Sequence, residues 1–324
     1  MLQTNKILIN RSGTKLKSKK GFILKIILGF LVFSVLITFI INTVIAYNIL
    51  YSMSDVRVEL NEATLEDFHL VGEQIEVFSS DGLKINAYIV PHENSRGNVL
   101  ILHGMHGMDA TSLFGYAQFL FEAGYTPVAV DMRAHGKSEG ERLSFGYHEV
   151  NDVNAVVNYL KTDDRFQGAP MILYGLSMGA STAINVAAKN DDIDAVIADS
   201  PYLSMQRQVA DYMKREGAPS FFIKLFEPSV NLVFWHLFRI NPVDNIPDKS
   251  ITELNHIPIF IIHGNADTQT AVYHASTLYE RSSSEMTELW IVEGKEHLII
   301  EDILDEESLF YRERIIGFLN GIGK

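Results

Sequence analysis

The centre of this 324-residue sequence reads Met171-Ile-Leu-Tyr-Gly-Leu-Ser-Met-Gly-Ala-Ser-Thr-Ala183. A short apolar run leads into a Gly-x-Ser-x-Gly motif, and small residues typical of a closely packed helix follow it. This order predicts a strand, a tight turn and a helix, with Ser177 held on the turn above the edge of a sheet. Glycine on both sides of the turn lets the strand and the helix approach each other without a Cβ clash. A helix that begins at Met178 would direct its first N–H group toward a developing oxyanion.

Apolar runs alternate with helical periodicity on both sides of this turn. Strands are expected at 73–79, 83–90, 98–102, 126–131, 170–174, 193–198, 257–262 and 288–292, and helices at 112–123, 148–160, 178–188, 272–279 and 309–319. Strands that alternate with helices predict a mostly parallel sheet covered by helices. The stretch 201–250, rich in large apolar residues and proline, interrupts the alternation. A functional insertion or subdomain is expected there, with ordinary core helices as the alternative.

A serine hydroxyl becomes a nucleophile beside a general base, and the base needs an acid that orients it. When a Gly-x-Ser-x-Gly turn carries the serine, the acid and then the histidine follow it in the chain. Asp267 and His297 each follow an expected strand, at the carboxyl edge where active sites of α/β proteins form. His274 also follows Asp267, but a position inside a helix suits a base poorly. We therefore predict that Ser177 is the nucleophile, His297 the base and Asp267 the acid.

A second oxyanion donor is expected from the loop after the strand at 98–102. That loop reads His103-Gly-Met-His-Gly-Met108, and the N–H of Met105 is the candidate that would act beside the N–H of Met178. His103 is expected to shape the loop by hydrogen bonding. A metal site on His103 and His106 is the alternative, which the absence of a carboxylate at matching spacing disfavours.

The loop after the strand at 126–131 also carries charged and titratable side chains. Asp131 and Arg133 are expected to pair and to hold this loop above the site. His135 is an alternative catalytic base, but it precedes the serine in the chain, against the expected order.

Together these motifs resemble the α/β-hydrolase superfamily, in the group of serine aminopeptidases and monoacylglycerol lipases. The resemblance covers residues 70–322 and rests on His103-Gly104, Asp131-x-Arg133-x-His135-Gly136-x-Ser138, Gly175-x-Ser177-x-Gly179, His263-Gly264-x-x-Asp267 and Gly294-x-x-His297. It implies an eight-stranded sheet with helices on both faces and a helical cap inserted after the sixth strand. That position matches residues 201–250, called the cap segment below.

The sequence departs from the family pattern at two places. Ala134 stands where the family commonly has glycine, and Thr268-Gln-Thr-Ala271 replaces the usual Val-Pro after the aspartate. The second change concerns the local turn rather than Asp267 itself. A serine at the turn also argues against dehalogenase and epoxide-hydrolase chemistry, since those relatives have aspartate at this position.

Charge separates the N-terminal part of the chain from the rest. The formal net charge of −13 combines +7 from residues 1–25, which contain no acid, with −20 from the remaining 20 basic and 40 acidic residues. Residues 26–54 carry no charge, and about 20 apolar residues suffice to cross a bilayer as a helix. We expect a basic cytoplasmic tail at 1–25, a transmembrane anchor at 26–50 and an extracytoplasmic hydrolase domain at 55–324. A signal peptide cleaved near Ala46 is the alternative, although its apolar region would be unusually long.

The composition excludes several classes of protein. The chain has no cysteine, so disulfide scaffolds, thiolate metal sites and a cysteine nucleophile are excluded. Its acidic balance disfavours general nucleic-acid binding. The sequence predicts a membrane-anchored serine hydrolase that cleaves an ester, without a metal or organic cofactor. The aromatic cap segment and the anchor favour a lipid or acylglycerol ester, with a thioesterase, a serine aminopeptidase and a non-catalytic binding module on the same fold as alternatives.

Overall fold

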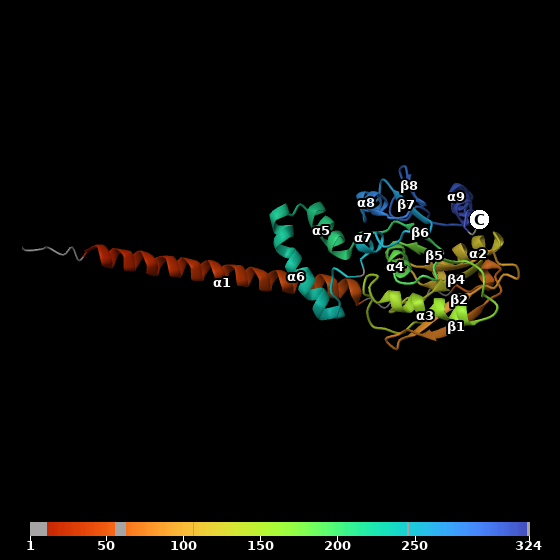
Figure 1. Cartoon of the computed structure of the whole chain (residues 1–324), viewed down its shortest axis with the longest axis horizontal. Coiled ribbons are helices and arrows are strands. Elements are labelled where there is room, and N and C mark those ends of the chain that lie inside the picture. Colours follow the sequence, from red (N-terminus) through yellow and green to blue (C-terminus); the bar gives the residue numbers. More distant parts are fainter. Residues whose placement is uncertain (1–11, 56–62, 106, 245, 323–324) are drawn as a thin grey trace, which may run out of the picture.

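A computed structural model of the chain describes residues 12–55, 63–105, 107–244 and 246–322, with side chains from residue 20 onward. Figure 1 shows a long helix, α1 (Ser12–Ser54), that leaves a layered domain of strands and helices. The expected basic tail lies partly outside the described residues, because its first eleven positions are not among them. The segment of α1 from residue 20 to residue 54 is long and apolar enough to cross a membrane, and the mean hydropathy of its most apolar 18 residues is 2.7.

The described residues form one eight-stranded, mostly parallel sheet, as expected. Its strands are β1 (Glu73–Phe78), β2 (Lys84–Ile89), β3 (Asn98–Leu102), β4 (Thr126–Val130), β5 (Met171–Leu176), β6 (Ala195–Asp199), β7 (Ile259–Gly264) and β8 (Thr287–Val292). The strand order is β1-β2-β4-β3-β5-β6-β7-β8. Strand β2 runs antiparallel to β1 and β4, and the other neighbours are parallel. Strands β3 to β7 are buried along their whole length, which their continuous apolar runs require.

Helices cover both faces of this sheet and form two apolar cores. Helices α3 (Glu149–Thr162), α4 (Met178–Ala187) and α8 (Tyr273–Arg281) contribute to the core on one face. Helices α2 (Phe114–Glu122) and α9 (Leu309–Leu319) contribute to the core on the other. The short 3-10 helices are η1 (Glu66–Phe68), η2 (Ala110–Leu113) and η3 (Glu306–Ser308).

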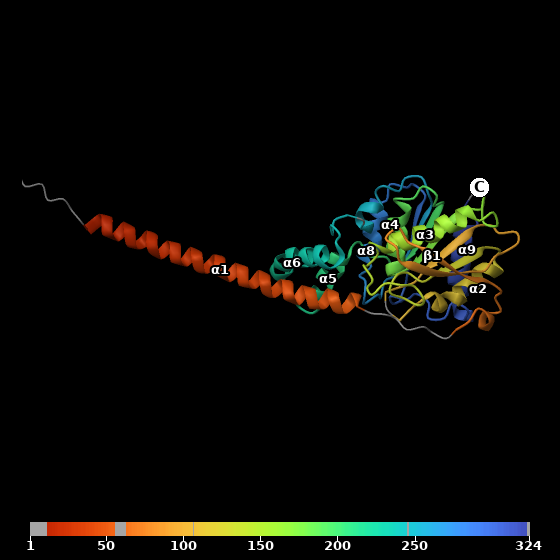
Figure 2. The same cartoon turned by 90° about the horizontal axis from the view of Figure 1, so that it is seen from below.

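The cap segment, inserted between β6 and β7, is helical. It forms α5 (Met205–Arg215), α6 (Ser220–Phe238) and the single turn α7 (Pro247–Ser250). Figure 1 shows α6 crossing the C-terminal half of α1 obliquely, and Figure 2 shows that the two helices lie against each other there. Ala46 and Leu50 of α1 are buried in the same apolar core as Phe226 and Val230 of α6. The end of α1 therefore packs against the cap segment, while its first half extends away from the domain.

Candidate active site

The turn between β5 and α4 presents Ser177 at the carboxyl edge of the sheet. Ser177 adopts φ +53° and ψ −111°, a conformation that is strained for a residue with a side chain. A Cβ at Gly175 would lie 2.2 Å from the carbonyl carbon of Gly179, and a Cβ at Gly179 would lie 2.2 Å from the carbonyl oxygen of Leu102. Both flanking positions therefore require glycine for β5, α4 and β3 to meet this closely.

Two further loops bring His297 and Asp267 to this serine. The Nε2 atom of His297, which follows β8, lies 2.7 Å from Ser177 Oγ. Its Nδ1 atom lies 2.7 Å from Oδ2 of Asp267, which follows β7. The structure thus brings together the three residues selected from the sequence and joins them by two hydrogen bonds. His297 is 8% exposed and the Asp267 side chain is fully buried.

Four N–H groups surround the carboxylate of Asp267. Oδ1 accepts the backbone N–H groups of Gln269 (2.8 Å) and Thr270 (2.7 Å). Oδ2 faces His297 Nδ1 and also His263 Nε2, at 3.1 Å. Burial alone would raise the pKa of Asp267, but the hydrogen bonds from the two histidines and the attraction to His297 outweigh it and hold the pKa well below its usual range. Asp267 is therefore ionised at neutral pH.

The candidate oxyanion loop lies directly beside the serine. A Cβ at Gly104 would be 3.7 Å from Ser177 Cβ, which brings the backbone before Met105 against this serine. Met178 is the first residue of α4, where helix N–H groups have no partner within the helix. His106 lies outside the described residues. In the described part of the chain, no group of three or more His, Asp or Glu side chains is placed to hold a metal ion.

Two buried histidines fix the shape of this loop. His103 Nε2 accepts the N–H of Met132 at 3.0 Å, so its Nδ1 carries the proton that is donated to the Gly104 carbonyl at 2.7 Å. Burial lowers the pKa of His103 well below its usual range, which keeps this ring neutral. His135 packs against it with ring centroids 4.4 Å apart, and its Nε2 lies 2.7 Å from the Met105 carbonyl oxygen. His135 therefore contacts the oxyanion loop rather than Ser177 Oγ.

The prediction that Asp131 pairs with Arg133 is wrong. Arg133 instead binds Asp152 through two guanidinium nitrogens, at 2.6–3.2 Å, and Asp81 through its NH1 and NH2 groups, at 2.8 and 3.1 Å. The Asp131 oxygens accept the backbone N–H groups of Ala110 and Lys137 and the side-chain amide of residue 86. The chain turns directly after β4, so the two side chains diverge. Arg133 meets α3 and the turn between β1 and β2, whereas Asp131 meets β2, η2 and the backbone of its own loop.

His274 is held by structural contacts, in agreement with its exclusion as a base. Its Nδ1 accepts the N–H of Leu203, and its Nε2 lies 2.8 Å from Oδ2 of Asp211 on α5. Gln208 of α5 also donates to the Thr270 hydroxyl at 2.6 Å. The first cap helix is therefore bound to the loop that carries Asp267.

A second buried carboxylate, which was not predicted from the sequence, lies behind the site. Asp199 ends β6, its backbone carbonyl accepts the N–H of Ser177, and its side chain accepts the hydroxyl of Tyr311 at 2.5 Å. The Ser200 hydroxyl lies 2.7 Å from the carbonyl oxygen of His297. Burial raises the pKa of Asp199 to about 6. An aspartate at the carboxyl end of the strand next to the nucleophile strand could have been selected from the sequence as a neighbour of the site.

Comparisons with known proteins agree with this architecture. The family model described as serine aminopeptidase, S33, matches residues 93–237. The solved esterase Pf2001 of Pyrococcus furiosus is similar with a TM-score of 0.65 and 26% identity, over 82% of this chain and 98% of that one. The chain belongs to the α/β-hydrolase superfamily and is a hydrolase.

Curated relatives extend the similarity across most of the domain. The chain is 27% identical over 255 residues to the uncharacterized protein YqkD of Bacillus subtilis, which covers 75% of this chain and 78% of that protein. It is 28% identical over 148 residues to the monoglyceride lipase of Saccharomyces cerevisiae, covering 40% of this chain and 44% of that protein.

Proposed function

We propose that the protein is a membrane-anchored serine hydrolase that cleaves a carboxylic ester through an acyl-enzyme. The observation that carries this proposal is the continuous hydrogen-bonded series from Ser177 Oγ through His297 to Asp267. His297 Nε2 takes the hydroxyl proton as Oγ bonds to the ester carbonyl carbon. It then returns that proton to the departing alkoxide as the carbon–oxygen bond breaks. Water, deprotonated by His297, releases the acid from Ser177 in the second half of the reaction.

Asp267 sets the tautomer of the base. Its Oδ2 accepts the proton on His297 Nδ1, which leaves Nε2 with a lone pair directed at Ser177. The ionised carboxylate also stabilises the imidazolium that forms when the serine proton is transferred. These two roles explain why the acid must stay charged at the pH of the reaction.

The proposed oxyanion site consists of the backbone N–H groups of Met105 and Met178. Support comes from the position of Gly104 against Ser177 and of Met178 at the start of α4. Each such donor contributes about 2.7–4 kcal/mol to the stability of the transition state in comparable sites. His103 and His135 act as positioning residues, since they hold the carbonyl groups of this loop.

Labelling with a fluorophosphonate tests the assignment of the nucleophile. The probe should label the wild type and fail to label Ser177→Ala. Ser283→Ala is the matched control, because Ser283 is exposed and precedes β8 at the opposite, amino edge of the sheet. Equal labelling of wild type and Ser177→Ala would contradict the proposal, and an unlabelled wild type would favour a non-catalytic binding module.

The substrate is proposed to be an ester with an apolar acyl chain. The aromatic cap segment and the similarity to an esterase and a monoglyceride lipase support this choice. Hydrolysis rates on p-nitrophenyl esters of increasing chain length should rise beyond acetate. A steady fall beyond acetate would contradict an apolar substrate, and turnover of acyl-thioesters or of aminoacyl amides in preference to esters would favour the thioesterase or aminopeptidase alternatives.

The anchor is proposed to be retained and to place residues 1–25 in the cytoplasm. Ala46 and Leu50 are 1% exposed within the core shared with the cap segment, so cleavage near Ala46 would uncover this core. The absence of native cysteine allows a clean topology test with Ser283→Cys. A membrane-impermeant maleimide should label this variant in intact cells. Labelling that requires lysis would contradict the orientation, and a mature chain that begins after Ala46 would contradict retention.

A further inference from the structure

The outer surface of α6 carries a continuous apolar stripe. Its residues Phe221, Leu225, Pro228, Leu232 and Trp235 are spaced by three or four positions and so follow one line along the helix. Phe221 is 65% exposed and Trp235 is 56% exposed. A row of large exposed apolar side chains on a helix indicates a surface that meets an apolar partner.

The position of α6 on α1 identifies this partner. The hydroxyl of Ser229, which is fully buried, lies 3.5 Å from the carbonyl oxygen of Phe39 in α1. Phe39 is thirteen residues beyond Ile26, where the uncharged stretch begins, or about 20 Å along the helix. The hydrocarbon core of a bilayer is about 30 Å thick. A span that begins at Ile26 therefore places the contact between Ser229 and Phe39 inside the bilayer.

The two helices advance in the same direction along their contact. Ser229 meets Phe39, and seven residues later the ring of His236 lies 6.4 Å from that of Tyr47. The N-terminal end of α6 consequently lies deepest, toward the middle of α1. Figures 1 and 2 show α5 and α6 outside the layered domain, on the side from which α1 extends.

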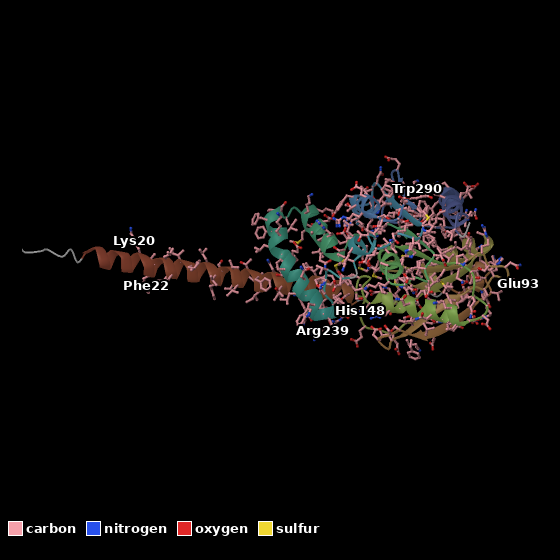
Figure 3. The ribbon with its side chains drawn as sticks, viewed as in Figure 1. Lys20, Phe22, Glu93, His148, Arg239 and Trp290 are labelled. Carbon is pink, nitrogen blue, oxygen red and sulfur yellow. The ribbon has the colours of Figure 1, made fainter. Side chains whose placement is uncertain are left out.

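The polar residues of α6 leave its apolar stripe uninterrupted, and its C-terminal end suits a membrane interface. Lys224, Glu227 and Asn231 share one flank of the apolar stripe instead of interrupting it. Arg239 ends the helix with its guanidinium 5.8 Å from the ring of Trp235, and Figure 3 shows Arg239 beside α1 near the hydrolase domain. An aromatic ring with an adjacent long basic side chain is typical of the level of the lipid headgroups.

We infer that α6 lies within the bilayer leaflet on the side of the hydrolase domain, beside α1, with its apolar stripe against lipid. This inference rests on the membrane anchor of the proposed function and extends it to the cap segment. The lipid contact is connected to the site through α5, because Gln208 binds Thr270 in the Asp267 loop and Asp211 binds His274 in α8, which follows that loop. The substrate class is then an ester that resides in the leaflet and reaches Ser177 along the cap segment.

Tryptophan quenching by brominated lipid tests the location of α6. The chain has two tryptophans, so Trp290→Phe leaves Trp235 as a reporter on α6. Trp235→Phe is the matched control and leaves Trp290 on β8, which Figure 3 shows on the far side of the domain from α1. The full chain is reconstituted in phosphatidylcholine vesicles with unmodified or brominated acyl chains. We expect bromination to cause a loss of emission in Trp290→Phe and no loss in Trp235→Phe.

A deeper reporter tests the direction of the helix. Phe221→Trp in a chain whose two native tryptophans are replaced by phenylalanine should lose more emission to bromines near the acyl-chain ends than Trp235 does. Equal quenching at both positions, or stronger quenching at Trp235, would overturn the proposed depth of the N-terminal end of α6.

Further readings separate this inference from the proposed function. Unchanged emission from Trp235 in chains that float with the vesicles would overturn the inference and leave the anchor intact. If acrylamide also fails to quench that Trp235, a second copy of the chain covers the stripe in place of lipid. Chains that do not float would overturn both the anchor and the inference. Fluorophosphonate labelling at Ser177 in the same samples reports on folding and on the hydrolase chemistry independently of lipid contact.

Discussion

Asp267→Asn should nearly abolish catalysis while leaving the fold in place. The carboxylate accepts two backbone N–H groups on Oδ1 and the His297 N–H on Oδ2, and His263 Nε2, which also binds the Thr270 carbonyl oxygen, approaches Oδ2 at 3.1 Å. An asparagine has one acceptor oxygen, so either the backbone pair or the histidine pair must face an NH₂ group. If the NH₂ group faces His297, Nδ1 becomes the acceptor and the ring proton moves to Nε2. The base then has no lone pair to take the proton of Ser177.

The expected loss in kcat is about 10⁴-fold, or about 5.5 kcal/mol in the activation barrier, because the analogous tautomer error in a serine protease has that size. Steady-state hydrolysis of p-nitrophenyl acetate measures kcat, and thermal unfolding checks the fold. Asp211→Asn is the matched control, since Asp211 binds His274 Nε2 at a similar distance, 2.8 Å, without contacting the triad. It should lose little activity on this small substrate.

The same substitution should change how stability depends on pH. The folded pKa of Asp267 is depressed, so its ionised form stabilises the fold above the ordinary aspartate pKa, about 4, and that contribution is lost as the pH falls. The difference in unfolding free energy between wild type and Asp267→Asn should therefore shrink in acid. An Asp267→Asn enzyme that keeps kcat within tenfold of wild type would refute the assigned role of Asp267.

Three other predictions concern the framework of the site. Gly179→Ala should destabilise the fold and abolish fluorophosphonate labelling, because its Cβ would lie 2.2 Å from the Leu102 carbonyl oxygen. Gly317→Ala in α9 is the control and should be tolerated, because the space around Gly317 is open. A stable Gly179→Ala variant that is still labelled would contradict the close approach of the two backbones. Arg133→Ala should lower the unfolding free energy by about 3–5 kcal/mol, since it leaves Asp152 buried without its cation. Arg314→Ala, which breaks an exposed ion pair with Glu288, is the control and should lower the unfolding free energy by only about 0–1 kcal/mol. Equal losses of unfolding free energy in the two variants would count against a special role for the buried pair. Asp199→Asn should gain about 3 kcal/mol of stability relative to wild type as the pH rises from about 4 to about 6, because the raised pKa of Asp199, about 6 in the folded protein, makes its ionisation oppose folding. Denaturant titrations across this pH range measure the difference in unfolding free energy, and a pH-independent difference would refute this.

The apolar patterns of the sequence predicted most of the strands and helices, because each pattern depends only on neighbouring residues. The strand at Asn98–Leu102 and the helix at Leu309–Leu319 begin and end where the apolar pattern does. The helix expected at 112–123 instead begins with η2, since Asp109 caps the backbone N–H groups of Thr111 and Ser112 and starts a 3-10 turn earlier. Capping by a single side chain outweighs periodicity at a helix end.

Contacts between distant loops were harder to predict. The pairing of Arg133 with Asp81 and Asp152 depends on how its loop meets α3 and the turn between β1 and β2, and no spacing within the chain encodes it. The second histidine on Asp267 is a similar case. His263 lies four residues before the acid in a motif selected for its aspartate, but only the turn at the end of β7 brings its Nε2 to Oδ2. The packing of α6 on α1 likewise joins residues far apart in the sequence, since the hydrogen bond between Ser229 and Phe39 connects positions 190 residues apart.

The charge distribution of the chain bears on the location of α6. The part of the chain beyond residue 25 carries a net charge of −20, so an anionic membrane surface repels the hydrolase domain as a whole. Helix α6 contains one lysine and one glutamate and is therefore neutral overall apart from His236. A neutral apolar helix can enter the leaflet without opposing that repulsion, while the acidic domain stays in water. The proposed anchor would supply the attachment that the domain's own charge opposes, and α6 is the surface through which we propose that the domain meets lipid.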